Sequence, residues 1–228
     1  MTAFAQADTA PRPVLTAFDW VPDFARGVVR DLRIRWAFEE IGRPYATELF
    51  SARDPRPESY LAWQPFDQVP AFAEGDLRFF ETGAILLYLG EQAERLLPTE
   101  PQARWTAIAW LFSALNSVEP YLGRIATYDL FHKDEAWMPP AREAALGLCR
   151  QKLKRVSDAL GDRDWLAGPF SIADIAMVTV LNTLRHTAIV AEYPKLAAYK
   201  QRREERPAYR RALAAQLADF EDQPSQAA

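Results

Sequence analysis

The sequence contains very little cysteine and histidine. Its 228 residues include one cysteine, Cys149, and two histidines, His132 and His186. A single cysteine cannot form an internal disulfide, which is typical of proteins in a reducing compartment such as the cytoplasm. None of the three side chains has the HxxxH or CxxC spacing of a metal site, so we expect no metal. We expect Cys149 to lie inert in a helical core.

The sequence also lacks an excess of positive charge and a long apolar run. Its 27 Lys and Arg residues against 31 Asp and Glu give a formal net charge of −4, so no basic surface for nucleic acid or an anionic membrane is indicated. No apolar run approaches the roughly 18 residues of a membrane span. The start of the chain, Met1–Pro13, lacks the basic and apolar blocks of a secretory signal. We therefore expect a cytoplasmic protein with no nucleic-acid or membrane partner.

The first half of the chain alternates between strand and helix signals. Short apolar or alternating runs predict four strands, at 14–18, 45–50, 69–73 and 77–80. Helical spacing predicts helices from Arg33 to Gly42, over 60–63 and over 84–89, the last with Gly90 just beyond it. The order β-α-β-α-β-β-α predicts a mixed sheet with helices on its faces. We assign residues 14–97 to an α/β thioredoxin-like N-terminal domain.

After Pro98 the strand signals disappear and long helical periods replace them. One long helix is predicted over 102–128, with a bend near Pro120, because proline lacks the N–H donor and crowds the preceding turn. Further helices are predicted over 139–160 and 172–183, and within 193–220. We therefore assign residues 102–220 to an all-α C-terminal helical domain.

The dipeptide Val69-Pro70 stands where a loop meets a predicted strand. Proline cannot donate a hydrogen bond to a sheet, so its position here is informative. A cis bond would turn the backbone N–H and C=O of Val69 outward, where they can pair with an extended peptide ligand. The alternative is a trans proline that begins an edge strand.

Glu81-Thr82 follows the predicted hairpin and opens an apolar helix. The first N–H groups of a helix lack internal partners and the helix dipole is positive there, so a ligand carboxylate is favoured beside Thr82. Glu81 can pair with a ligand ammonium, and together the two residues suit the end of an α-amino acid. The alternative is an ordinary N-cap formed by Thr82, with Glu81 in solvent.

Ser171 and Asp174 have the spacing of a capping box at the start of the helix predicted over 172–183. Phe170 and Ile175 occupy the positions of a hydrophobic staple across the same helix start. We interpret this group as structural and not catalytic.

These motifs occur in one order at compatible distances, and together the sequence resembles the cytosolic glutathione transferase superfamily. The resemblance extends from about Val14 to Leu213. It is carried by the segments Arg33-Ile34-Arg35-Trp36-Ala37-Phe38-Glu39-Glu40, Gln68-Val69-Pro70-Ala71-Phe72, Glu81-Thr82-Gly83-Ala84-Ile85, Ser171-Ile172-Ala173-Asp174 and Arg206-Pro207-Ala208-Tyr209.

The resemblance implies a binding site for glutathione. It implies a cis bond at Val69-Pro70, with Val69 pairing to the cysteine backbone of glutathione and Gln68 near the glycyl end. Glu81 and Thr82 would hold the γ-glutamyl group, with threonine in place of the commoner serine. A homodimer and a hydrophobic acceptor pocket between the domains are implied as well. The candidates for that pocket, whose alternative role is ordinary bundle core, are Tyr121, Tyr128, Phe131 and Trp137.

The sequence departs from the family pattern just after the first strand. The family usually has a Ser, Tyr or Cys there that activates the glutathione thiol, but residues 20–30 contain none of these. The thiolate is the nucleophile, so the thiol pKa must fall from about 8.5 towards neutrality. We expect Arg26, or as second choice Arg30, to stabilise the thiolate, with Trp20 shaping the pocket. The alternative is that both arginines lie at the surface and backbone amides stabilise the thiolate.

Three functions remain open. The first is a transferase that joins glutathione to a small hydrophobic electrophile. The second is a glutathione-dependent peroxidase or isomerase of the same fold, and the third is a non-catalytic glutathione-binding or interaction protein. The missing hydroxyl favours the third, whereas Glu81 and Thr82 favour the first two. The absence of a cysteine near the first strand argues against a mixed disulfide with the protein's own thiol.

Overall fold

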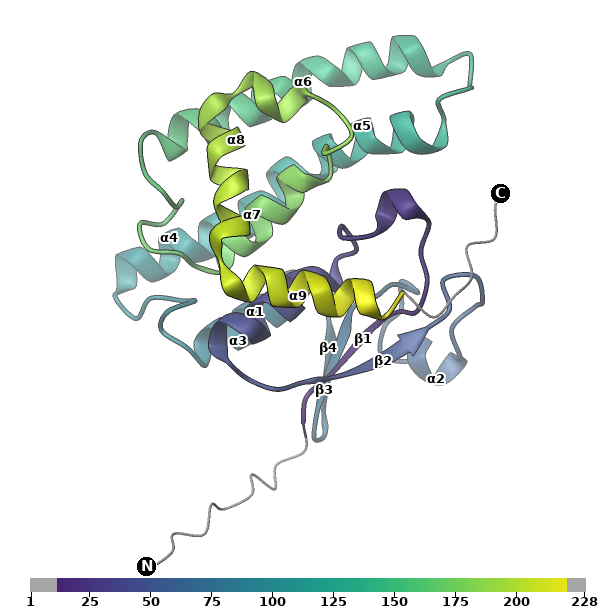
Figure 1. Ribbon diagram of the computed structural model, residues 1–228, viewed down its shortest axis with the longest axis vertical. Coiled ribbons are helices and arrows are strands. Elements are labelled where there is room, and N and C mark those ends of the chain that lie inside the picture. The colour runs from purple at the N-terminus through teal and green to yellow at the C-terminus, as the bar shows by residue number, and fades with distance from the viewer. Residues whose placement is uncertain (1–11, 221–228) are drawn as a thin grey trace, which may run out of the picture.

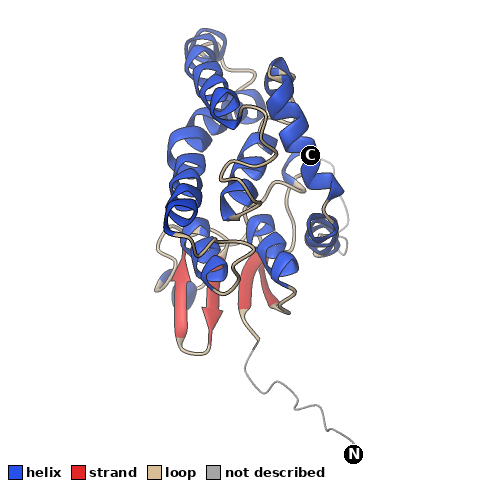
Figure 2. Ribbon diagram, turned by 90° about the vertical axis from the view of Figure 1, so that its left-hand side faces the viewer, coloured by secondary structure: helices blue, strands red, loops and turns tan. Residues whose placement is uncertain are grey.

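Four strands from the first half of the chain form a mixed sheet. In the computed structural model, which describes residues 12–220, they are β1 (Val14–Phe18), β2 (Ala46–Phe50), β3 (Ala71–Glu74) and β4 (Leu77–Phe80). Their order in the sheet is β2-β1-β3-β4, with β1 parallel to β2 and antiparallel to β3. The predicted thioredoxin-like sheet is confirmed, and Figure 2 shows it at one end of the molecule. The expectation about a signal at Met1–Pro13 lies almost entirely outside the described residues.

Three helices accompany the sheet: α1 (Asp31–Ile41), α2 (Glu58–Leu61) and α3 (Thr82–Glu91). Helix α1 ends where expected, because Gly42 adopts the left-handed conformation with φ +69°. The prediction that Gly90 lies just beyond α3 is wrong, since the helix continues through it. A Cβ at Gly90 would lie 3.1 Å from the Cγ2 of Ile172, so this glycine allows the two halves to approach closely.

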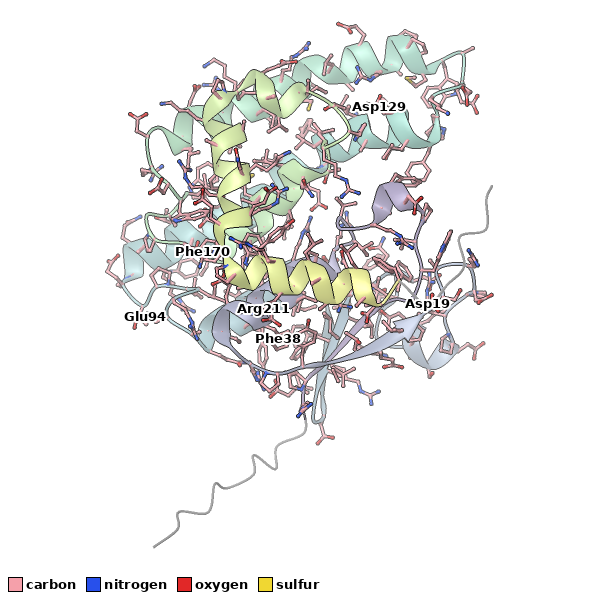
Figure 3. The ribbon with its side chains drawn as sticks, viewed as in Figure 1. Asp19, Phe38, Glu94, Asp129, Phe170 and Arg211 are labelled. Carbon is pink, nitrogen blue, oxygen red and sulfur yellow. The ribbon has the colours of Figure 1, made fainter. Side chains whose placement is uncertain are left out.

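The second half is helical, as predicted (Figure 1). Its main helices are α4 (Pro101–Phe112), α5 (Glu119–Phe131), α6 (Met138–Leu160), α7 (Ile172–Asn182), α8 (Pro194–Gln201) and α9 (Pro207–Ala218). Helix α9, on which Figure 3 labels Arg211, returns to the first half and lies along α1. There Arg211 Nε donates to Glu39 Oε2 at 2.5 Å. Within residues 12–220, no helix is both long enough and apolar enough to cross a membrane.

The predicted bend near Pro120 is a π-helical segment, Ser113–Val118, that separates α4 from α5. Pro120 has no N–H to donate into the preceding turn, and the backbone widens to π geometry just before it. The interruption places Glu119 at the start of α5, facing the first half of the chain.

One continuous hydrophobic core runs through both halves and includes Trp36 on α1 and Ile175 on α7. The predicted capping box is confirmed, with the backbone N–H of Ser171 donating to Asp174 Oδ2 at 2.9 Å. Tyr199 also donates its hydroxyl to Asp174 Oδ1 at 2.8 Å, so Asp174 ties α7 to α8. Cys149 is buried in this core, and burial raises the pKa of its thiol to about 11. Its expected role as an inert core residue agrees with this environment.

Candidate functional site

A cleft of about 980 Å³ lies between the sheet domain and the helical domain. One half of its wall, which we call the strand half, comes from the first domain; its lining residues are Gln64, Gln68, Val69, Pro70, Glu81 and Thr82. The other half, which we call the helix half, comes from one face of α5 and from residues 183–186 after α7. The segment between β1 and α1 lies at the boundary and contributes Phe24, Ala25, Val28 and Arg30.

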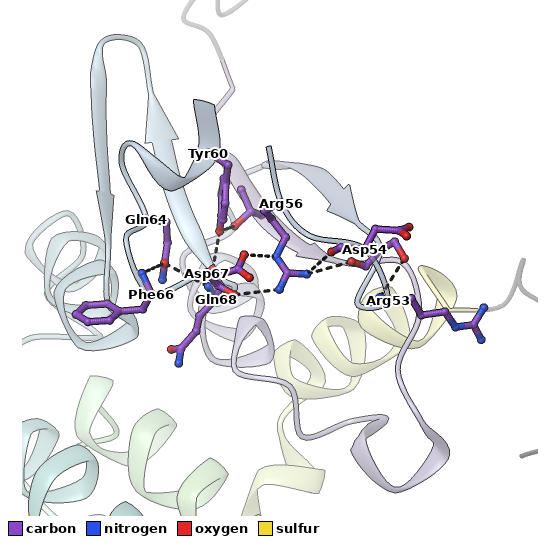
Figure 4. A network of polar contacts seen from close by, with 10 residues as sticks. Arg53, Asp54, Arg56, Tyr60, Gln64, Phe66, Asp67 and Gln68 are labelled. Atoms are coloured by element: carbon purple, nitrogen blue, oxygen red, sulfur yellow. Dashed lines mark hydrogen bonds and ion pairs between the residues drawn. The ribbon is translucent and has the colours of Figure 1, made fainter. Parts of the chain in front are cut away.

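A polar network holds the backbone that leads into β3 (Figure 4). The Val69-Pro70 bond is cis. Just before it, Tyr60 donates its hydroxyl to the Gln68 carbonyl at 2.6 Å, and Gln64 Oε1 accepts from the Gln68 N–H at 3.2 Å. Arg56 Nε donates to Asp67 Oδ1 at 2.6 Å. The backbone of this loop is thus fixed from behind, while the Gln68 side chain stays exposed at the cleft.

Thr16, which was not among the predicted site residues, connects this network to the sheet. Its hydroxyl oxygen accepts from the Ala71 N–H at 2.7 Å and lies 2.9 Å from the Tyr60 hydroxyl. Thr16 is fully buried in β1. The available signal was a threonine within an otherwise apolar strand, which needs a hydrogen-bond partner when buried.

The mouth of α3 opens into the cleft. Glu81 precedes the helix in a left-handed conformation with φ +76°, and its side chain makes no capping hydrogen bond within the described residues. Thr82 is the first helical residue and not the N-cap, and it is buried while Glu81 is exposed. A Cβ at Gly83 would lie 2.7 Å from Leu115 Cδ1, so a glycine lets the π-helical segment approach this helix start. The arrangement leaves a positive helix end available to an anion.

Arg33 lies beneath this helix mouth and was not among the predicted site residues. It is 3% exposed and its Nη1 donates to Thr82 Oγ1 at 3.2 Å. Its Nε donates to Thr179 Oγ1 at 2.9 Å, and its Nη2 donates to Glu119 Oε1 at 2.9 Å. One guanidinium therefore connects α1 with α3, α7 and α5. The available signal was an arginine on the apolar face of α1.

Glu119 receives a second arginine, since Arg30 Nε donates to its Oε1 at 3.0 Å. Burial raises the pKa of Glu119, but the charges and hydrogen bonds of Arg33 and Arg30 outweigh burial and hold it below the ordinary value. The carboxylate is therefore ionised at neutral pH. Two arginines share one carboxylate here, which leaves a positive charge near the mouth of α3.

The structure does not bring Arg26 and Trp20 to the cleft. Arg26 Nη2 donates to the Phe220 carbonyl at 3.3 Å, and its Nε lies 3.4 Å from Asp23 Oδ1. The guanidinium of Arg53 covers the Trp20 ring, 3.9 Å from its centroid. The segment before α1 turns these two side chains away and directs Arg30 into the cleft instead.

Of the four aromatic residues expected in the acceptor pocket, the structure places only Phe131 in the cleft wall. Tyr121 lies under Lys152 Nζ, 4.6 Å from the ring centroid, and the ring of Tyr128 packs on Trp137 at 5.7 Å. The face of α5 towards the cleft is formed by pairs at 119/120, 123/124, 126/127 and 130/131, at helical spacing. Tyr121 and Tyr128 are on other faces.

Contacts between elements hold the helix half in place. Phe131 meets Phe24 edge to face at 5.3 Å and joins α5 to the segment before α1. His186 Nε2 lies 3.2 Å from Asp129 Oδ2, and Arg142 also pairs with Asp129, which Figure 3 labels on α5. Between residues 12 and 220, no group of three or more His, Cys, Asp or Glu side chains is arranged to hold a metal ion.

Comparison with known proteins adds independent findings. The family "Glutathione S-transferase, N-terminal domain" matches residues 14–91, and "Glutathione S-transferase, C-terminal domain" matches residues 139–202. The disulfide-bond oxidoreductase YfcG of Escherichia coli K12 is 33% identical over 174 residues, covering 72% of this chain and 80% of that protein. The glutathione S-transferase GstA of Escherichia coli O157:H7 is 31% identical over 179 residues, covering 75% of this chain and 85% of that protein.

A solved structure is also similar throughout. It is a glutathione transferase family member from Pseudomonas fluorescens with two glutathione bound. The superposition has a TM-score of 0.79 at 25% identity and covers 91% of this chain and 95% of that one.

Proposed function

The chain belongs to the glutathione S-transferase family, and from this premise we propose that it conjugates the glutathione thiolate to a small hydrophobic electrophile. One observation carries the proposal: the backbone at Val69-Pro70 and the uncapped mouth of α3 line the same half of one cleft. A peptide strand and an α-amino acid end can be held there together.

The strand half suits glutathione group by group. The cysteinyl backbone of glutathione pairs with the backbone N–H and C=O of Val69. The γ-glutamyl carboxylate binds at Thr82, where the helix dipole and the buried guanidinium of Arg33 favour negative charge. The γ-glutamyl ammonium pairs with Glu81, which is exposed at the cleft, and the glycyl end lies near Gln68.

Arg30 is the group that we propose for thiol activation. It lines the cleft beside Val28, and within the described part of the chain its side chain donates only from Nε, to Glu119 Oε1 at 3.0 Å, so its other N–H groups can donate to a thiolate. No Ser, Tyr or Cys from the segment between β1 and α1 is available to take this role. Charge and hydrogen bonding to the thiolate lower the thiol pKa. The thiolate then attacks the electrophilic carbon, a C–S bond forms, and the leaving group departs with its electron pair.

A second candidate function is the glutathione-dependent reduction of disulfides. Cys149 is buried and the pKa of its thiol is about 11, so this protein offers no thiolate of its own. Both thiols needed to reduce a disulfide would then come from glutathione. A cleft of about 980 Å³ has room for a second thiol compound. The name of one relative and the two glutathione molecules in the Pseudomonas fluorescens structure support this alternative.

We also propose that the protein is a homodimer in the cytoplasm. Several large apolar side chains outside the cleft are exposed, among them Phe66, Trp105 and Phe112. Exposed apolar side chains of this size are typical of protein–protein contacts. Sedimentation equilibrium of the wild type and of Trp105→Ser would test the dimer.

The proposed function is tested by calorimetry with glutathione followed by turnover assays. We expect saturable binding and release of chloride from a chloronitrobenzene substrate. Binding with turnover only of a hydroperoxide or of a disulfide would replace conjugation by peroxidase or reductase activity. Absence of binding at millimolar glutathione would identify a non-catalytic interaction protein.

A further inference from the structure

The charges that line the cleft are unevenly distributed between its two halves. The four arginines of its wall are Arg30, Arg33, Arg124 and Arg185, and the two carboxylates are Glu81 and Glu119. Glu119 is shared by Arg30 and Arg33, and Glu81 lies in the strand half, next to the mouth of α3. Two positive charges, at Arg124 and Arg185, therefore belong to the helix half, where the acceptor binds according to the proposed function.

Neither Arg124 nor Arg185 is neutralised by the part of the chain that the structure describes. No carboxylate of residues 12–220 forms an ion pair with either guanidinium. Arg124 projects from the cleft face of α5 and is exposed. Arg185 donates from Nη2 to the Phe24 carbonyl at 2.8 Å, which ties it to the apolar rim of the cleft.

The surroundings of Arg185 strengthen the positive field. On its far side it borders a second cavity together with Lys200, Arg203 and Arg210, where the only carboxylate of the described lining is Glu204. Burial is the main cause that lowers the pKa of Arg185; Tyr209 opposes the shift, and the charge of the buried Arg203 adds to it. An anion on the cleft side of Arg185 would relieve this repulsion, whereas a neutral apolar acceptor would not.

We propose that the preferred acceptor is an apolar electrophile that carries a carboxylate, which binds at the outer wall formed by Arg124 and Arg185. Its apolar body lies against Phe24 and Phe131 at the same rim. This inference rests on the proposed function, because it assumes that glutathione occupies the strand half. It adds the two arginines as specificity-determining residues for the reaction.

The chemical step leaves the acid group unchanged. The glutathione sulfur attacks an activated aromatic carbon, the C–S bond forms, the C–Cl bond breaks, and chloride leaves with the bonding electrons. The carboxylate positions the ring through charge-assisted hydrogen bonds to the arginines.

A matched pair of substrates tests this selectivity. A chlorodinitrobenzoate and the corresponding chlorodinitrobenzamide have similar size, and each enzymatic kcat/KM is divided by the uncatalysed rate constant with glutathione. We expect the wild type to prefer the benzoate by roughly tenfold, the scale of one charge-assisted hydrogen bond. The preference should shrink about threefold in Arg124→Gln or Arg185→Gln and vanish in the double variant, and it should weaken at high salt.

Two further variants separate charge from folding. Arg185→Lys keeps the charge and should retain most of the preference, even where loss of the Phe24 contact lowers overall activity. Arg155→Gln removes an exposed arginine of α6 outside the cleft and should leave the preference unchanged. An equal preference in the wild type and the double variant would overturn the inference while leaving conjugation intact.

Binding of product-like compounds distinguishes this failure from failure of the proposed function. Calorimetry compares S-benzylglutathione with S-(carboxybenzyl)glutathione in the wild type and in the double variant. If only the wild type binds S-(carboxybenzyl)glutathione more tightly than S-benzylglutathione, the selectivity for a carboxylate is supported. This holds even if neither chloro compound reacts, and in that case only the proposed conjugation activity fails. Equal binding of the two compounds by the wild type contradicts the selectivity.

Discussion

The two halves of the cleft are built in different ways. The strand half is formed by backbone: a cis peptide bond at Val69-Pro70 and a helix start at Thr82, separated by one hairpin. The helix half is formed by side chains from α5 and from residues 183–186, which lie more than fifty residues apart in sequence. A site formed by backbone can bind the same ligand whatever its side chains are. A site formed by side chains can change its specificity when a single side chain is replaced. The Arg33–Glu119 pair is the polar link between them.

The largest effect is expected from breaking that link. Arg33→Met removes the only buried partner that Glu119 has among residues 12–220 and leaves the carboxylate to the more exposed Arg30. We expect the free energy of unfolding to fall by about 3 kcal/mol, because a charge that loses its partner in the interior is costly. Denaturant unfolding measures this, with Arg155→Met on the exposed surface of α6 as the control. A change as small as that of the control would show that the pair does not stabilise the domain interface.

A smaller effect, confined to the strand half, is expected from Glu81→Gln. The variant keeps the size of the side chain and removes the charge that we assign to the γ-glutamyl ammonium. The dissociation constant of glutathione should rise about tenfold, or about 1.4 kcal/mol. Calorimetry measures it, and Glu135→Gln, an exposed residue outside the cleft wall, is the matched control. Unchanged affinity would remove Glu81 from the binding site.

Arg30 lies at the boundary of the halves, and its replacement should affect chemistry more than binding. In Arg30→Gln the thiol pKa of bound glutathione should rise by about one unit, because one charged donor near the sulfur is lost. Arg26→Gln serves as the matched control, since Arg26 contacts Phe220 and not the cleft. Ultraviolet absorbance of the thiolate follows both titrations. A larger rise of the thiol pKa in Arg26→Gln than in Arg30→Gln would assign thiol activation to Arg26 instead of Arg30.

The link between the halves should also give a pH dependence. The pKa of Glu119 is lowered in the folded protein, so its contribution to stability is fully present above the unfolded value of about 4.3 and is lost as the pH falls through the folded pKa. We expect the free energy of unfolding of the wild type to fall more than that of Glu119→Gln as the pH is lowered through this acid range. Unfolding free energies of both proteins over the same range measure the difference. An equal fall in unfolding free energy for the two proteins would contradict the stabilising role of the ionised Glu119 carboxylate.

The smallest effect is expected in the helix half, from Phe131→Ala. Phe131 is 64% exposed at the rim of the cleft, so we expect an acceptor to cover only part of its ring. We expect the KM for an aromatic acceptor to rise about threefold, since only part of the ring area is removed from water. The glutathione dissociation constant should stay unchanged. A change in glutathione affinity alone would show that the two halves are not functionally separate.

The sequence predicted most of the strand half because its signals are local. Gly42 ends α1, the turn at 74–76 joins β3 to β4, and the motifs at Val69-Pro70 and Glu81-Thr82 each consist of neighbouring residues. The fold class follows from the same short-range patterns. The bend before α5 was also predictable, because Pro120 lacks an N–H wherever it stands.

The helix half was harder to predict because it depends on packing. A π turn at 113–118 inserts an extra residue into the helical repeat and rotates the faces of α5 by about 100°. This rotation decides that Gly123 and Phe131, rather than Tyr121 and Tyr128, face the cleft. Arg33 was missed for a similar reason, since its partner Glu119 is 86 residues away.

The orientation of Arg26 also depends on a long-range contact. Its acceptor, the carbonyl of Phe220, lies 194 residues away, just after the end of α9. Residue type and local spacing alone therefore could not distinguish Arg26 from Arg30.

A crystal structure of the protein with glutathione is the most direct test of the account. We predict that the cysteinyl backbone of the tripeptide pairs with Val69 and that its γ-glutamyl carboxylate meets the first N–H groups of α3 above Arg33. Glutathione bound instead only along α5, with the mouth of α3 left empty, would contradict it.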